Sequence, residues 1–595
     1  MWRTLYKNLY GNENENYYDT LKTPGPSTAL TSLAPPPVVK PSGDEGVFDI
    51  ERNGSQWRLE TKITLSELEL ESISGLACLY APPGSTVSLQ ADTHIAGRDD
   101  GVVFVGTIMS FDHERIPISL VSADIGCGLS IIPVVRDGKH VRESELSLGD
   151  AHKFHLHALM CMRTSLKRGK VAEQGLSECT FLNEAAEFYG QDLDEWLSGL
   201  DYVIECTGLQ KGKKSTLEYV STFSQSLGSS GNHFCELTVD DNGFYWLVVH
   251  SGSRALGAKV YETVSTLSRH VTGGLEVATG PLALFYTRAY DALNKFAKFN
   301  RIVCAIAVLS ALKCETSASI LKKVMMDSPV FAPAIEKCSS TDQPAMIALL
   351  GGLTHNGIKA YINPVEKQVL YVLSKGAVSM CKRASASIVA LRAGEGSIVW
   401  TMADGSKQWR EVSLGEALEL NYTPVYSSNE VVYSGHGAGR SRSTTKTASL
   451  STFGDIVDFF KEHDVVGNIA PGVLGDNPSS AYKPLEAVIA ALPTESACTL
   501  TYLRTRVSYK EGLSFKGPDT KRCAEFIEAN WDVENDDILQ YDLNASARFL
   551  PRRTEMVEEQ NRVWERVQEH LFGEFATPHF SYLSYISSQK KIKKM

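Results

Sequence analysis

The sequence predicts an α+β fold, and three observations support this class. Short apolar, β-branched runs such as 101–111, 129–135 and 368–376 end at glycine or charged residues, as strands do. A long run, 282–313, is rich in alanine, leucine and aromatic residues and has the length of a helix. These strands and helices do not alternate regularly, which disfavours a doubly wound sheet. We therefore expect central β-sheets surrounded by helices.

Length and composition bound the organisation and the compartment. With 595 residues the chain is too long for one ordinary core, so it should hold several units or one large domain with additions. No apolar run approaches the roughly 18 residues that span a bilayer, and the N-terminus lacks the apolar stretch of a signal peptide. The 12 cysteines form no CxxC pair, which fits a reducing compartment. We expect a cytoplasmic protein without membrane association.

Changes in composition divide the chain into three parts. Residues 1–46 include a segment rich in proline, serine and glycine and are expected to form a flexible tail and linker. Residues 47–517 carry the mixed strand and helix pattern of the main domain. Residues 518–595 show helical periodicity followed by a basic tail and are expected to be a helical C-terminal extension. The net charge of −11 disfavours non-specific coating of nucleic acid but allows a local basic channel.

The segment "SADIGCGLS" is the first that indicates chemistry. Asp124 and Cys127 stand three residues apart, and Gly126 and Gly128 flank the thiol. Glycines allow the tight turn that aims a carboxylate and a thiolate at one point, and a thiolate can bridge two metal ions. A buried cysteine in a tight turn is the structural alternative, which this segment leaves open.

Three histidines extend this set. His233 follows a Gly/Ser run that can bring backbone N–H groups close to a phosphate, His250 ends an apolar run, and His355 precedes an asparagine. Each histidine by itself is more typical of a structural residue. Together with the carboxylate and the thiol, they make a ligand set for two divalent metals, with zinc and manganese both open on ligand type.

A second histidine cluster is a competing metal site. His152, His155 and His157 lie closer together in sequence than the other histidines. Their neighbours are bulky, without a carboxylate, a thiol or a glycine turn. We therefore predict the start of a helix here and no metal site.

The segment "VVYSGHGAGRSRS" raises the question of what His436 does between glycines at the end of a predicted strand. A glycine-rich turn with a space-filling histidine is the simplest interpretation. The chemical alternative is a nucleophile, since a neutral imidazole can form a phosphoramidate and small neighbours leave room for in-line attack. Arg440 could then neutralise phosphate charge.

Six motifs in this order resemble the RtcB family of GTP-dependent RNA ligases: "DIGCG", "GNHFCE", "HSGSRALG", "THN", "HGAGR" and "AYK". Weaker agreements are "ADTH" at 91–94, "KFNR" at 298–301 and "SFKG" at 514–517. The resemblance covers residues from about 50 to 517 and implies an RtcB-like fold.

The resemblance implies an enzyme that joins an RNA 3′-phosphate or 2′,3′-cyclic phosphate to a 5′-hydroxyl, in RNA repair or tRNA splicing. His436 would take GMP from the co-substrate GTP, with Asp92 as the second catalytic residue. Two Mn²⁺ ions are implied, sharing one cysteine. Asp124, Cys127 and His233 would hold one ion, and Cys127, His250 and His355 the other.

The resemblance also implies a nucleotide site. Asn232 would orient phosphate, Glu236 would recognise guanine, and Tyr482 and Lys516 would contact the guanylate. The complete implied set is Asn232, Glu236, Ser397, Gly437, Ala438, Gly439, Arg440, Tyr482 and Lys516. The implied partners are RNA, such as a cleaved transfer RNA, and an accessory activator protein; we expect a monomer.

Two segments depart from the family pattern. The family's HRKGA is "LSKGA" here, and its glycine-rich nucleotide loop corresponds to "GSIVWTM". Loss of an arginine weakens a phosphate contact, and loss of small residues narrows a nucleotide pocket. Two other functions therefore stay open: an RNA-binding or assembly protein on a degraded ligase scaffold, and a metal-dependent cyclic phosphoesterase.

Overall fold

The structure is a computed structural model. It describes residues 4–5, 8–9, 35–98, 101–121, 123–166, 177–190, 193–209, 216, 220, 226–228, 233–272, 275–331, 353–381, 385–390, 396–402, 408–441, 462–467, 482–483, 485–491 and 498–510. The predicted C-terminal extension, 518–595, lies outside these residues.

The first sheet has nine strands in the order β1-β2-β3-β4-β5-β15-β14-β19, with β20 beside β15. Neighbouring strands are mostly antiparallel, but β3 pairs with β4 in parallel because the helix α3 connects them. The strands are β1 (Val38–Pro41), β2 (Val47–Arg52), β3 (Ser55–Thr61), β4 (Thr86–Arg98), β5 (Gly101–Ser110), β14 (Asn356–Asn363), β15 (Gln368–Lys375), β19 (Arg410–Val412) and β20 (Thr423–Val425).

The second sheet has eight strands in the order β13-β7-β11-β10-β23-β18-β17, with β22 beside β23. Its strands are β7 (Gly128–Pro133), β10 (Phe234–Asp240), β11 (Tyr245–Ser251), β13 (Leu353–Thr354), β17 (Ser385–Ala390), β18 (Ser397–Met402), β22 (Val466–Gly467) and β23 (Cys498–Tyr509). Three small two-stranded sheets are β6 (Arg115–Pro117) with β12 (Val277–Thr279), β8 (Val135–Arg136) with β9 (Lys139–His140), and β16 (Ala377–Cys381) with β21 (Val431–Gly435).

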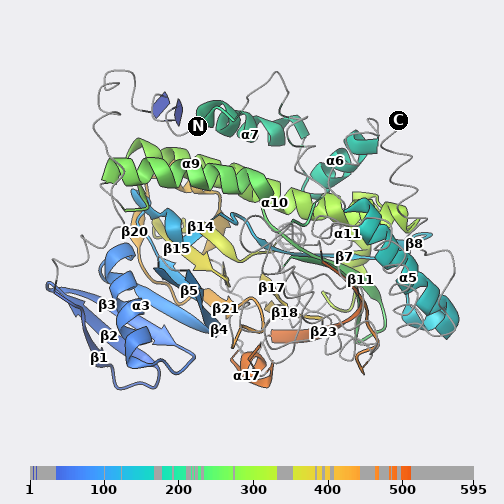
Figure 1. Ribbon diagram of the computed structural model, residues 1–595, viewed down its shortest axis with the longest axis horizontal. Coiled ribbons are helices and arrows are strands. Elements are labelled where there is room, and N and C mark those ends of the chain that lie inside the picture. The colour runs from blue at the N-terminus through green and yellow to red at the C-terminus, as the bar shows by residue number, and fades with distance from the viewer. Residues whose placement is uncertain are drawn as a thin grey trace, which may run out of the picture.

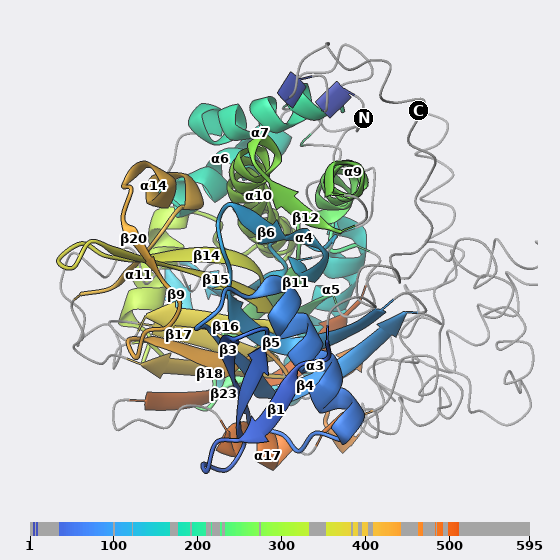
Figure 2. The ribbon, with the colours of Figure 1, turned by 90° about the vertical axis from the view of Figure 1, so that its left-hand side faces the viewer.

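Helices pack around these sheets, so the predicted α+β class is confirmed. The long helices α9 and α10 run along one side of the molecule, and Figure 2 views them nearly end-on beside the sheets (Figures 1 and 2). The helices are α3 (Glu67–Tyr80), α4 (Ile118–Val121), α5 (Leu148–Ser165), α6 (Ser177–Phe188), α7 (Leu193–Thr207), α9 (Arg254–Thr272), α10 (Pro281–Ala311), α11 (Ala318–Asp327), α14 (Leu414–Glu419) and α17 (Leu485–Ala490), with a 3₁₀ turn at Glu143–Glu145. Among the described helices, none is both long enough and apolar enough to cross a membrane.

Local sequence signals explain where several helices begin. Ser66 and Glu69 form a capping box at the start of α3: the Ser66 hydroxyl accepts from the Glu69 N–H at 3.3 Å, and the Glu69 carboxylate accepts from the Ser66 N–H at 2.8 Å. At the start of α5 the Ser147 hydroxyl accepts a hydrogen bond from the Asp150 N–H at 3.1 Å. Pro281 occupies the first turn of α10, where its missing N–H costs nothing.

Two described residues near the N-terminus, Leu5 and Asn8, pack against the main domain, unlike a free tail. Leu5 is fully buried in the main core, and the Asn8 side chain donates a hydrogen bond to the Cys206 carbonyl at 3.0 Å. β1 begins at Val38, before the boundary expected at 46, and pairs with β2. The three-part division of the chain stays a prediction, since much of the first part and all of the third lie outside the described residues.

Helix α10 connects the core to the turn that carries Cys127. It packs against β7 and β11 and against α5, α6, α7 and α9. Its Arg301 side chain is fully buried and donates hydrogen bonds to the Gly126 carbonyl at 2.9 Å, the Ser251 carbonyl at 2.7 Å and the Ser130 hydroxyl at 3.0 Å. The Arg301 guanidinium therefore holds the turn before β7 and the end of the adjacent strand β11.

Replacing Arg301 by methionine is expected to lower the free energy of unfolding by about 2–5 kcal/mol, because two buried carbonyls lose their donor. Urea unfolding followed by circular dichroism measures this. Arg288→Met on the same helix is the matched control: Arg288 is exposed and lies over the Tyr202 ring, so its loss should cost less than about 1 kcal/mol. Equal effects in both variants would contradict the role given to Arg301.

Candidate functional site

The Asp124–Cys127 turn directly precedes β7, and its two glycines are needed for steric reasons. Gly126 has φ +72°, a conformation that other residues rarely adopt. A Cβ on Gly128 would collide with the Leu353 carbonyl of the neighbouring strand β13. The turn is closed by a hydrogen bond of 3.2 Å from the Cys127 N–H to the Asp124 carbonyl. The carboxylate and the thiol thus lie on one side of a rigid turn.

Strand order brings the three histidines to this turn. In the second sheet β13, β7, β11 and β10 are neighbours, and His250 on β11 stands opposite Leu129 on β7 and Phe234 on β10. His233 directly precedes β10. His355 lies between β13 of the second sheet and β14 of the first. The site therefore forms where the two large sheets meet.

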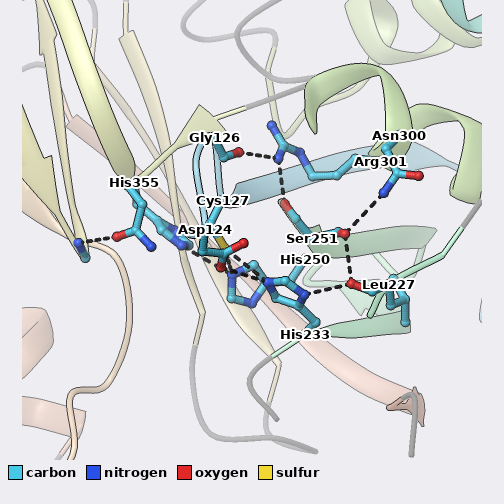
Figure 3. A network of polar contacts seen from close by, with 12 residues as sticks. Asp124, Gly126, Cys127, Leu227, His233, His250, Ser251, Asn300, Arg301 and His355 are labelled. Atoms are coloured by element: carbon cyan, nitrogen blue, oxygen red, sulfur yellow. Dashed lines mark hydrogen bonds and ion pairs between the residues drawn. The ribbon is translucent and has the colours of Figure 1, made fainter. Parts of the chain in front are cut away.

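Four potential metal donors surround a fifth, the Cys127 sulfur (Figure 3). The sulfur lies 3.2 Å from the Nε2 atoms of both His233 and His250. His233 Nε2 is 3.2 Å from an Asp124 carboxylate oxygen, and His250 Nε2 is 3.3 Å from His355 Nε2. The donors form two groups of three, and within each group the ligand atoms lie within 4.8 Å of one another. The groups are Asp124, Cys127 and His233, and Cys127, His250 and His355. These are the same two sets that the family resemblance implies.

The protonation of the donors suits a cation. Burial lowers the pKa of both His250 and His355 well below the ordinary value, so their rings are neutral. Burial raises the pKa of the Asp124 carboxyl, but His233 outweighs this and the net shift is downward, so the group is ionised. The His233 Nδ1–H donates to the Leu227 carbonyl at 2.7 Å, which turns Nε2 toward the Cys127 sulfur. Nitrogen lone pairs and a carboxylate this close need a positive charge between them.

The Cys127 thiol supports the same conclusion. Burial, together with the Asp124 carboxylate, raises its pKa well above the ordinary value. A thiolate is stable at this position only beside a cation. The donor chemistry therefore fits one or two divalent metal ions, and the neutral imidazoles and the thiol suit several of the transition metals.

A second group of residues fixes the loops behind the donors. The Asn300 amide donates hydrogen bonds to the Ser226 carbonyl at 3.0 Å and to the Ser251 hydroxyl at 3.2 Å. The Ser251 hydroxyl donates to the Leu227 carbonyl at 3.0 Å, the same carbonyl that orients His233. The "KFNR" segment of α10 thus supports both sides of the donor cluster through Asn300 and Arg301 (Figure 3).

His436 follows β21 and is held by Asp92 of β4. One Asp92 carboxylate oxygen accepts hydrogen bonds from the His436 N–H at 3.0 Å, the Gly437 N–H at 3.2 Å and the His436 Nδ1–H at 2.9 Å. Burial raises the pKa of Asp92, but its bonds to His436 outweigh this, so the carboxylate is ionised. In the neutral ring, donation by Nδ1 leaves the lone pair on Nε2. The His436 ring centroid lies 4.4 Å from that of His355.

Most of the predicted nucleotide residues surround His436. Gly437, Ala438 and Gly439 form the same turn, and a Cβ on Gly439 would collide with the Asp92 backbone. The Arg440 guanidinium lies 5.4 Å from the centre of the Tyr482 ring, and the two residues form an antiparallel bridge.

Glu236 is buried on β10, three residues after His233. Its carboxylate accepts hydrogen bonds from the Ser508 hydroxyl at 2.8 Å and the Thr505 hydroxyl at 3.0 Å, both on the adjacent strand β23. Its side chain is 1% exposed, so these hydroxyls fix the orientation of the carboxylate.

Ser397 lies at a different level of the second sheet from Glu236. Strand pairing sets it opposite Leu503 on β23, whereas Glu236 stands opposite Ser508 of the same strand. The two positions are separated by roughly 16 Å along β23. Asn232 and Lys516 lie outside the described residues.

Lys510 is a site candidate that the motif comparison missed. It follows Tyr509, which pairs with Cys235 beside Glu236, and it is only 4% exposed. The sequence signal was a lysine directly after a long β-branched run, six residues before the lysine chosen on the "SFKG" match. A lysine this buried at a strand end is uncommon and points to a polar role.

In the "LSKGA" segment, the residues that depart from the family pattern lie inside a strand. Leu373 and Ser374, at the positions of the lost histidine and arginine, are buried inside β15 between β5 and β14. The retained part faces the site: Gly376 has φ +62° and its N–H donates to the Asn356 side chain at 2.8 Å. The Ala377 N–H donates to the His355 carbonyl at 3.1 Å.

The competing histidine cluster lies on helix α5. His155 contacts the Tyr245 hydroxyl at 3.0 Å and His157 lies 3.6 Å from the Cys161 sulfur of its own helix. Within the described residues, the two groups that could hold a metal do not include these histidines.

Comparison with known proteins identifies the family of this chain. The family model of the tRNA-splicing ligase RtcB matches residues 85–510. The chain belongs to the RtcB family. RNA-splicing ligase RtcB1 of Escherichia coli strain ATCC 25922 is 25% identical over 420 residues, covering 68% of this chain and 85% of that protein. RNA-splicing ligase RtcB of Escherichia coli K12 is 23% identical over 420 residues, with the same coverage. At the level of the family, the function is RNA ligation.

Replacing Cys127 by serine is expected to remove at least one bound metal ion per chain, because a hydroxyl is not deprotonated near neutral pH and is a poor bridge. Metal content after dialysis, measured by mass spectrometry, checks this. Cys235→Ser, a change at another fully buried thiol, should keep the metal. Full metal content in the Cys127 variant would rule out the shared thiolate.

Metal binding is expected to release about one proton near neutral pH, because the Cys127 thiol is protonated until a cation arrives while His250 and His355 are already neutral. The affinity should therefore rise with pH, by up to about tenfold per pH unit. Calorimetric titration with Mn²⁺ in two buffers of different ionisation enthalpy measures the released proton. Binding without proton release would mean that the thiol is not a ligand.

Proposed function

We propose that this chain is a GTP-dependent RNA ligase that joins RNA 3′-phosphate or 2′,3′-cyclic phosphate ends to 5′-hydroxyl ends. The observation that supports this most directly is the His436–Asp92 pair. A buried carboxylate holds the imidazole through Nδ1 and leaves Nε2 free, next to a cluster of metal-type donors. A histidine that only filled a turn would not need this fixed orientation.

The proposed first step is the attack of His436 Nε2 on the α-phosphorus of GTP. The N–P bond forms as the bond from that phosphorus to the bridging oxygen breaks, and pyrophosphate leaves. The ring becomes positively charged while Nδ1 keeps its proton. The Asp92 carboxylate, 2.9 Å from Nδ1, stabilises that charge without moving a proton.

In the later steps the guanylate moves from His436 to the RNA 3′-phosphate, and the RNA 5′-hydroxyl then attacks that phosphate and releases GMP. The phosphate of the new bond comes from the RNA itself. A 2′,3′-cyclic end must first be opened by water to the 3′-phosphate.

We propose manganese as the metal, held by Asp124, Cys127 and His233 on one side and by Cys127, His250 and His355 on the other. Bound there, divalent ions supply charge stabilisation for phosphate oxygens. The chain's own contribution is rigidity, since the Leu227 carbonyl fixes the His233 ring and Arg301 fixes the Cys127 turn.

For the nucleotide we propose Tyr482 and Arg440 as the flat platform beside the His436 turn, and Glu236 as the group that selects the base. The Ser508 and Thr505 hydroxyls hold the Glu236 carboxylate in one orientation. We propose Lys510 in place of Lys516 as the guanylate lysine, because it is buried and follows β23 two residues after Ser508, the residue opposite Glu236.

Changing His436 to alanine is expected to abolish covalent labelling by radioactive GTP and Mn²⁺ while metal content and fold stay intact. The label on the unmodified protein should be lost in acid and kept in alkali, as for a phosphoramidate. The variant should still join RNA whose 3′-end was guanylated beforehand, because the later steps do not use the imidazole as nucleophile.

His113→Ala serves as the control, because His113 stacks on Tyr371 and contacts Asp112, neither of which belongs to the proposed site, so this variant should label normally. Normal labelling of the His436 variant would overturn the proposal. Absence of labelling in the unmodified, metal-loaded protein would favour an RNA-binding scaffold. Opening of a cyclic phosphate without GTP would favour a phosphoesterase.

A further inference from the structure

The segment of β4 that carries Asp92 is not paired in regular register with the neighbouring strands. β4 pairs with β5 up to Leu89, opposite Thr107, and again from His94, opposite Val105. Residues 90–93 therefore face Gly106 alone. On its other side, β4 pairs with β3 only as far as Leu89. The catalytic carboxylate thus stands on a bulge, where regular pairing holds neither side of the strand.

The Lys483 side chain binds this bulge. Its ammonium donates a hydrogen bond of 2.9 Å to the Ala91 carbonyl and a second, short one to the Thr93 carbonyl. These are the carbonyls immediately before and after Asp92. Two charge-assisted hydrogen bonds therefore grip the backbone on both sides of that residue.

The same segment also binds the His436 turn. The Lys483 N–H donates to the Gly439 carbonyl at 3.0 Å, and the preceding Tyr482 bridges to Arg440. One dipeptide therefore contacts the nucleophile's turn through its backbone and the Asp92 strand through its side chain. The carboxylate and the imidazole come from strands that are more than 300 residues apart in the chain, so their 2.9 Å contact depends on such a connection.

We propose that Lys483 is a positioning residue that holds Asp92 against His436 and links this pair to the nucleotide platform at Tyr482. This inference rests on the proposed function of His436. Charge supports it: burial lowers the pKa of Lys483, and the Asp92 carboxylate opposes that shift. The ammonium is therefore close enough to be stabilised by the carboxylate that it positions.

Lys62 provides a matched control. It is a more exposed lysine, and Asp92 also stabilises its charge. Its ammonium, however, donates to the Ala491 carbonyl at 3.0 Å and makes no bond to the neighbours of Asp92. If only the charge near Asp92 mattered, both lysines would be equivalent. If the hydrogen bonds to the bulge matter, only Lys483 is needed.

The kinetic experiment uses the full chain loaded with Mn²⁺. Lys483→Met is expected to slow self-guanylation at saturating GTP by about 10- to 100-fold, as for a displaced catalytic group, with unchanged metal content. Lys483→Arg, which keeps the charge and the donors, should recover most of the rate. Lys62→Met should stay within about twofold of the unmodified protein. A rise in KM for GTP at an unchanged rate, or equal losses in both methionine variants, would overturn the proposal.

A spectroscopic experiment tests the inference without guanylation. A proton in the Nδ1–H bond between His436 and Asp92 gives a strongly downfield NMR signal, which Asp92→Asn identifies by removing it. We expect Lys483→Met to weaken or shift this signal, Lys483→Arg to restore it and Lys62→Met to leave it unchanged. If the unmodified protein never labels with GTP, the proposed function fails while this signal still decides the role of Lys483. An unaltered signal in Lys483→Met would overturn that role.

Discussion

The crowding of donors around one buried sulfur is the constraint on which the site depends. Cys127 lies 3.2 Å from two imidazole nitrogens, and an ionised carboxylate and a third imidazole complete the cluster. Such a group is unfavourable in a protein interior unless a cation neutralises it. The surrounding structure holds the donors there: glycines at 126 and 128 shape the turn, and the buried Arg301 ties it to the core.

His436, the proposed nucleophile, is connected to this cluster because the two large sheets meet at the site. Asp92 belongs to the first sheet, Cys127 and His250 belong to the turn and strands of the second, and His355 lies at the passage between them. The His436 turn comes from a small separate sheet, and its glycines let it press directly against Asp92. The fold thus places the His436 ring beside the donor cluster, with its centroid 4.4 Å from that of the His355 ring, although the two come from separate sheets.

One of the two departures from the family pattern, the "LSKGA" segment, lies within a sheet. Leu373 and Ser374 replace polar family residues at buried positions of β15, where they pack within a sheet. The Lys-Gly-Ala portion, whose backbone contacts His355 and Asn356, is retained. In this segment the changed residues, Leu373 and Ser374, lie inside the strand. The retained Gly376 and Ala377 are the residues whose backbone contacts Asn356 and His355.

From the sequence the fold class and the family could be predicted correctly, and five candidate donors and a candidate nucleophile could be named. These predictions depend on residue type and local spacing, such as glycines beside a thiol or histidines at the ends of apolar runs. The tertiary structure was needed to show that the five donors lie close together in space, that Ser397 is far along β23 from Glu236, and that Lys510 is buried just beyond the end of β23. It also showed that Lys483 grips the backbone around Asp92. These relations arise from strand order and register between segments distant in the chain, which local spacing does not encode.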